Sequence, residues 1–65
     1  MKTKQLRERT REELDELYGD LCEELFKLRA QRAVAQLEKA HRVKEVRRTI
    51  ARVLTVLKDG GYSHA

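Results

Sequence analysis

The stretch "VKEVRRTIARVLTVLK", from Val43 to Lys58, decides the fold. Its aliphatic side chains recur every three or four positions, which places them in one stripe along an α-helix. The opposite face carries lysines and arginines, and Glu45 is the only acid in the stretch. The stripe needs a partner helix, while the basic face suits a polyanionic partner. The residues of the stripe are Val43, Val46, Ile50, Val53 and Leu57.

A second helix is predicted upstream of this stretch. Thr10 and Glu13 have the spacing of a capping box, in which each side chain binds the backbone N–H of the other residue. From there, apolar residues alternate four and three positions apart and form a seam: Leu14, Tyr18, Leu21, Leu25 and Leu28, widened by Leu17, Cys22 and Phe26. This spacing predicts that the second helix also buries one face.

The connection between the two helices has no Gly or Pro from Arg29 to His41, so local propensity alone permits one continuous rod. The seam of the first helix, continued past Leu28, does not join the stripe of the second. A rod would also leave both stripes uncovered unless it dimerised. We therefore predict a bend near residues 37–40, which folds the two stripes against each other.

The predicted fold class is all-α, an antiparallel two-helix hairpin with a short N-terminal turn or helix. Residues 1–9 form a basic segment packed beside the hairpin, and residues 10–59 form the hairpin itself. Gly60 and Gly61 follow as the C-cap of the second helix. We predict a loose tail over residues 60–65.

Composition narrows the possible functions. The chain has 65 residues, a net charge of +4 and a pI near 9.6. Charge is uneven, because residues 12–26 hold seven acids and no base, while residues 40–58 hold six bases and one acid. A single cysteine excludes an intrachain disulfide and fits a reducing compartment. No apolar segment resembles a signal peptide or a membrane span, so we predict a cytoplasmic protein without membrane insertion.

Catalytic and metal sites have no candidate in the sequence. There is no nucleophile–base pair and no glycine-rich phosphate loop, so we predict that the chain is not an enzyme and needs no cofactor. His41 has only Glu38 and Glu45 as nearby co-ligands, and Cys22 has no second cysteine, so no metal site is expected. We expect Cys22 to be a small buried hydrophobe.

Several segments of the sequence resemble a known protein family. The segments "REELDEL", "EELFKLRAQ" and "AQLEKAHRVKEVRRTIARVLTVL" resemble the bacterial large-subunit ribosomal protein twenty-nine family over roughly residues 4–58. The most specific part is the combination of Val46-Arg47-Arg48, Ile50-Ala51-Arg52 and Thr55-Val56-Leu57, which a coiled coil has no reason to produce. The resemblance implies a structural constituent of the large ribosomal subunit, near the nascent-chain exit tunnel, that acts in translation.

Partners and contact residues follow from the charge pattern and the resemblance together. Only three aromatic residues are present, so contact with RNA should be made mainly through phosphates, by arginine and lysine on rigid helices. The resemblance implies large-subunit ribosomal RNA, the neighbouring ribosomal protein twenty-three, and chaperones or targeting factors at the tunnel exit as partners. The predicted RNA-binding residues are Lys4, Arg7, Arg29, Arg32, Gln36, His41, Arg42, Lys44, Arg47, Arg48, Arg52 and Thr55.

Two other functions fit parts of the pattern. In a coiled-coil interaction module without nucleic-acid binding, the seams would serve self-association and the charges only solubility. A basic amphipathic helix on a membrane surface would need bulky apolar anchors, and the second helix has no Trp or Phe. RNA affinity that falls steeply with salt distinguishes the ribosomal function from salt-insensitive dimerisation.

Overall fold

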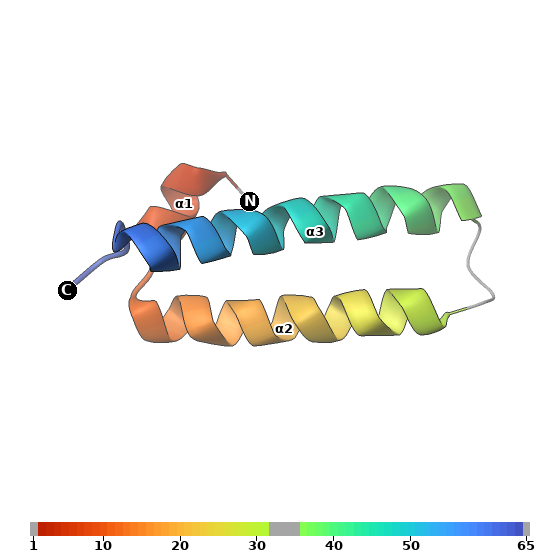
Figure 1. Cartoon of the computed structure of the whole chain (residues 1–65), viewed down its shortest axis with the longest axis horizontal. Coiled ribbons are helices and arrows are strands. Elements are labelled where there is room, and N and C mark those ends of the chain that lie inside the picture. Colours follow the sequence, from red (N-terminus) through yellow and green to blue (C-terminus); the bar gives the residue numbers. More distant parts are fainter. Residues whose placement is uncertain (1, 32–35, 65) are drawn as a thin grey trace.

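A computed structural model describes residues 2–31 and 36–64 of the chain. The element order is α1 (Thr3–Arg7), α2 (Arg11–Ala30) and α3 (Gln36–Asp59). Figure 1 shows α2 and α3 running antiparallel, with α1 lying against the C-terminal half of α3. The molecule is elongated, with extents of 42 × 17 × 15 Å. The predicted all-α hairpin with a short N-terminal helix is confirmed.

Helix α2 begins where the capping box predicts. The Thr10 hydroxyl accepts a hydrogen bond from the Glu13 backbone N–H at 3.3 Å, and the Glu13 carboxylate accepts one from the Thr10 N–H at 3.4 Å. Two backbone donors that the helix leaves unpaired are thereby satisfied. Glu12 and Glu13 also lie in the first turn, where the helix dipole favours negative charge.

The chain reverses earlier than predicted. Helix α2 ends at Ala30 and α3 begins at Gln36, so residues 37–40, where the bend was expected, form the first turns of α3. Residues 37–40 are good helix formers and include no Gly or Pro, so they continue α3 instead of breaking it. Lys39 supports this arrangement, because its ammonium donates to the carbonyl of Gln31 at 2.6 Å and to that of Arg29 at 3.4 Å. It thereby binds carbonyls at the C-terminus of α2 that have lost their helical partners.

The core lies at the end of the hairpin where all three helices meet. Leu6 of α1, Leu14 of α2 and two valines of α3, Val53 and Val56, are completely buried in one cluster. The stripe predicted for α3 is displaced, because Val56 is fully buried while Ile50 and Leu57 are only half-buried. Helix α3 packs against both α1 and α2, and its buried face is therefore rotated toward α1.

A threonine also lies on the buried face of α3. Thr49 is only 7% exposed, and its hydroxyl donates to the backbone carbonyl of Glu45 at 3.0 Å. Because that hydrogen bond stays within the helix, the polar group is buried without losing its partner.

Two predictions about the α2 seam are wrong. Phe26, expected to widen the seam, is 74% exposed, and Cys22 is half-buried rather than buried. Leu37 on α3 is 84% exposed. Phe26 lies in the last turns of α2 and Leu37 in the first turn of α3, whereas α1 lies at the other end of the hairpin (Figure 1). Two packed helices bury a narrow seam, so side chains at its edge stay in solvent when no third element covers them.

Residues 60–64 are not the loose tail that we predicted for residues 60–65, of which Ala65 lies outside the described part of the chain. Gly60 has a φ of 71°, the left-handed conformation typical of the residue after a helix. Ser63 then forms an isolated bridge with Thr10, and its N–H donates to the Arg9 carbonyl at 2.9 Å. Tyr62 packs against the core cluster. These long-range contacts, which no local pattern reveals, tie the segment to the start of α2.

Gly19 offers a test of helix stability. It lies exposed in the middle of α2, and a Cβ built there meets no atom within 4 Å. Gly19→Ala should therefore raise the free energy of unfolding by about 0.5–1 kcal/mol, because alanine restricts the unfolded backbone and favours the helix. Urea denaturation followed by circular dichroism measures the change.

Gly60→Ala is the matched control, since it makes the same chemical change at a positive φ. It should destabilise the protein by about 1–2 kcal/mol, because a Cβ is strained in the left-handed conformation. Equal effects of the two substitutions would contradict the assignment of their backbone conformations.

Candidate nucleic-acid interface

The basic face of α3 is the strongest candidate for a functional site. Lys44, Arg48 and Arg52 are spaced four residues apart, Arg47 directly precedes Arg48, and all four are exposed. Because α3 is a regular helix of 24 residues, it presents these cations in a fixed arrangement over about two turns. The structure thus brings together the four bases at the centre of the predicted set.

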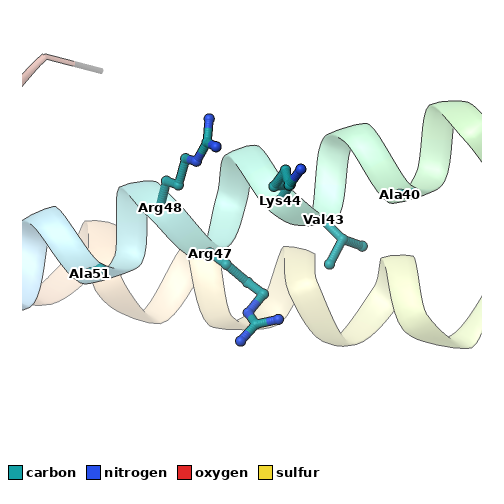
Figure 2. A pocket seen from close by; sticks show the side chains of 6 residues that line it. All are labelled: Ala40, Val43, Lys44, Arg47, Arg48 and Ala51. Atoms are coloured by element: carbon teal, nitrogen blue, oxygen red, sulfur yellow. The ribbon is translucent and has the colours of Figure 1, made fainter.

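A shallow groove runs along this face, with a volume of about 540 Å³. Figure 2 shows the side chain of Arg48 leaving one side of α3, those of Arg47 and Val43 leaving the other, and that of Lys44 lying over the helix between them. Ala40 and Ala51 lie at the two ends of this stretch and complete the lining. The sequence did not predict Ala40, Val43 or Ala51 as site residues. The sequence feature that could have indicated them is the occurrence of two alanines, Ala40 and Ala51, among the basic residues of one helix face.

A second hollow of about 290 Å³ adjoins the first and shares Lys44 and Arg48 with it. It adds two residues of the predicted set, His41 and Arg52. Thr55 lies one turn further along α3, exposed, and its hydroxyl donates to the Ala51 carbonyl at 2.9 Å. The basic face therefore extends from His41 to Thr55.

Arg42, a predicted RNA contact, forms ion pairs within the protein. Its guanidinium donates to the Glu24 carboxylate of α2, with Nε–Oε1 at 2.8 Å, and lies 3.4 Å from the Glu45 carboxylate. The hydrogen bond and charge of Glu24, with a smaller effect of Glu45, raise the pKa of Arg42. This pair links the two long helices of the hairpin.

Arg7 is paired in the same way at the other end of the molecule. Its guanidinium donates to the Asp59 carboxylate, with Nη2–Oδ2 at 3.0 Å, which links α1 to the last residue of α3. The pair raises the pKa of Arg7. The same hydrogen bond, together with one from the Gly61 N–H at 2.7 Å, lowers the pKa of Asp59. A side chain at Gly61 would meet the Arg7 guanidinium, so glycine gives this ion pair its space.

The rest of the predicted set is dispersed. Lys4 is exposed on α1, and Arg29 is exposed in the last turn of α2, at the opposite end of the hairpin. Gln36 is the first residue of α3. Arg32 lies outside the residues that the structure describes. All twelve residues stay predictions as RNA contacts, but those whose side chains the structure describes do not form one continuous patch.

Other site types have little support in the structure. Among residues 2–31 and 36–64, no group of histidine, cysteine and acidic residues could hold a metal ion. Cys22 instead pairs with Tyr18, and the hydrogen bond between their side chains raises the pKa of the Tyr18 phenol. None of the described helices is long and apolar enough to cross a membrane.

Comparisons with known proteins find similarity to one family over most of the chain. The family model described as "Ribosomal L29 protein" matches residues 4–59. The large ribosomal subunit protein uL29 of Solidesulfovibrio magneticus is 57% identical over 56 residues, which cover 86% of this chain and 88% of the relative. The uL29 protein of Desulforudis audaxviator is 49% identical over the full length of both chains. No solved structure gives a significant match. With this extent of similarity, the chain belongs to the ribosomal L29 protein family.

Proposed function

We propose that this chain is a structural constituent of the large ribosomal subunit, binding ribosomal RNA through the basic face of α3. The single observation that carries the proposal is the row of exposed cations from Lys44 to Arg52 on one rigid helix. Arginine grips phosphate with two parallel hydrogen bonds, and phosphate contacts supply most of the affinity of basic proteins for nucleic acids. Membership of the ribosomal L29 family supports RNA of the large subunit as the ligand.

The proposed place of action is the ribosome in the cytoplasm, near the exit of the nascent-chain tunnel, where the protein would serve translation. Its proposed protein neighbour there is ribosomal protein twenty-three, and chaperones or targeting factors would dock nearby. Support for these partners comes from the family resemblance. The exposed acidic residues of α2, such as Glu12, Asp15 and Glu16, suit contact with a protein neighbour better than with RNA, because phosphates repel them.

The proposed role is structural rather than catalytic and involves no cofactor. A coiled-coil interaction module is a weaker alternative, because Leu14 and Val53, which would lie in the seam of such a module, are already buried inside the hairpin of a single chain. Self-association would need that seam to open.

Cofractionation tests the proposal directly. A tagged copy of the chain should migrate with large ribosomal subunits in a sucrose gradient and remain bound through a high-salt wash, as expected for an assembled ribosomal protein. The purified chain should bind ribosomal RNA with an affinity that falls steeply as salt rises, since each phosphate contact releases about one counterion. Absence from the subunit fraction, combined with salt-insensitive dimerisation, would overturn the proposal in favour of the coiled-coil alternative.

A further inference from the structure

Two alanines bound the groove on the basic face of α3. Ala40 and Ala51 are both exposed and lie eleven residues apart, which is about 16.5 Å along the helix at 1.5 Å per residue. Lys44, Arg47 and Arg48 lie between them (Figure 2). At each end of the groove, the backbone of α3 is therefore covered only by the methyl group of an alanine. Long charged side chains lie between these two positions.

The three cations of the groove are available to a ligand. Within the part of the chain that the structure describes, Lys44, Arg47 and Arg48 form no salt bridge, whereas Arg7 and Arg42 each bind a carboxylate. The groove therefore combines an apolar surface with uncompensated positive charge on both sides.

We infer that Ala40 and Ala51 are close-approach positions, at which the sugar–phosphate backbone of a base-paired RNA segment enters the groove and packs its riboses against α3. The inference rests on the proposed function and specifies how the same face contacts RNA. Phosphates would bind Arg48 on one side, Arg47 on the other and Lys44 between them, as Figure 2 places them. Ribose carbons would contact Ala40, Val43 and Ala51, whose small size lets the backbone come near enough for the cations to reach it.

The lining of the groove favours paired RNA over single strands. Proteins that hold single-stranded RNA generally stack its bases on aromatic side chains. None of the six residues that line the groove is aromatic. A base-paired segment instead presents a regular backbone and a wide, shallow minor groove with its riboses exposed. A regular helix that carries three cations within five residues suits such a regular surface.

Size-changing substitutions at the two alanines test this inference. Ala51→Leu and Ala40→Leu keep the charge and the helix propensity but add bulk to the groove. We expect each to weaken binding to a labelled RNA hairpin with a fully paired stem by about tenfold, which corresponds to about 1.4 kcal/mol. Ala51→Ser, which stays small, should bind like the wild type. Fluorescence anisotropy measures the affinity, and circular dichroism verifies that each variant remains helical.

Ala30→Leu is the matched control, since it makes the same change at an exposed position at the end of α2 that does not line the groove. It should leave the affinity unchanged. An unpaired RNA of the same length should bind the wild type more weakly than the hairpin does.

The outcomes separate the inference from the proposed function. If the wild type binds the hairpin with a steep salt dependence and both leucine variants bind equally well, the close-approach role is wrong while RNA binding stands. Tighter binding of the unpaired strand would also overturn the inference. If the wild type shows no salt-dependent affinity for ribosomal RNA or for either probe, the proposed function itself fails.

Discussion

Replacing Arg47, Arg48 and Arg52 together by alanine should reduce the affinity for ribosomal RNA by about a thousandfold. Hydrogen bonds to charged groups contribute roughly 1.5–3 kcal/mol each, and three at the lower value amount to about 4.5 kcal/mol, a factor of roughly 10³ in affinity. The slope of log K against log salt should fall by nearly three units, because each lost phosphate contact removes about 0.9. Filter binding at several salt concentrations measures both quantities.

A triple variant elsewhere controls for net charge. Lys2, Arg11 and Lys27 are exposed bases outside the predicted interface, so replacing them by alanine removes the same total charge. Long-range attraction should then weaken slightly, whereas the contacts on α3 stay intact. If the two triple variants lost affinity equally, overall charge rather than the basic face of α3 would govern RNA binding.

Leu14→Ala should cause the largest loss of stability among single substitutions in α2. Leu14 is completely buried and packs in one cluster with Leu6, Val53 and Val56, which come from the other two helices. Buried leucine-to-alanine changes cost about 2–5 kcal/mol, through lost apolar contact and the cavity left behind. A chain of 65 residues buries little core and has a small total stability, so the variant should be partly unfolded at room temperature.

Leu54→Ala is the matched control for this prediction. Leu54 is 45% exposed on α3, and its truncation should change the free energy of unfolding by no more than about 1 kcal/mol. Urea denaturation of both variants, followed by circular dichroism, provides the comparison. Equal destabilisation by the two substitutions would show that the core is not centred on the cluster at the α1 end.

Local signals in the sequence predicted the helices and the basic face correctly. The capping box of Thr10 and Glu13 involves neighbouring residues, so its pattern is complete within four positions. The bases of α3 share a face because helical geometry alone relates positions three and four residues apart. The motif around Arg47, Arg48 and Arg52 carried the family resemblance, which the match over residues 4–59 confirmed.

Features that depend on contacts between distant segments could not be predicted in this way. Periodicity identifies an apolar face but not what covers it, so Phe26 was expected in the seam but is exposed in the last turns of α2. Val56 is buried because α1 lies against α3. The tail is ordered through Ser63, which binds backbone far away in the sequence.

In the candidate site, too, some features follow from the sequence and others depend on the tertiary structure. Sequence alone determined that α3 carries a row of bases opposite an aliphatic stripe, because that follows from helical spacing. Only the tertiary structure decided which bases are engaged within the protein, since Arg7 reaches Asp59 and Arg42 reaches Glu24 across the fold. An ion pair requires two side chains within a few ångströms, and for residues far apart in sequence the packing of the helices sets that distance.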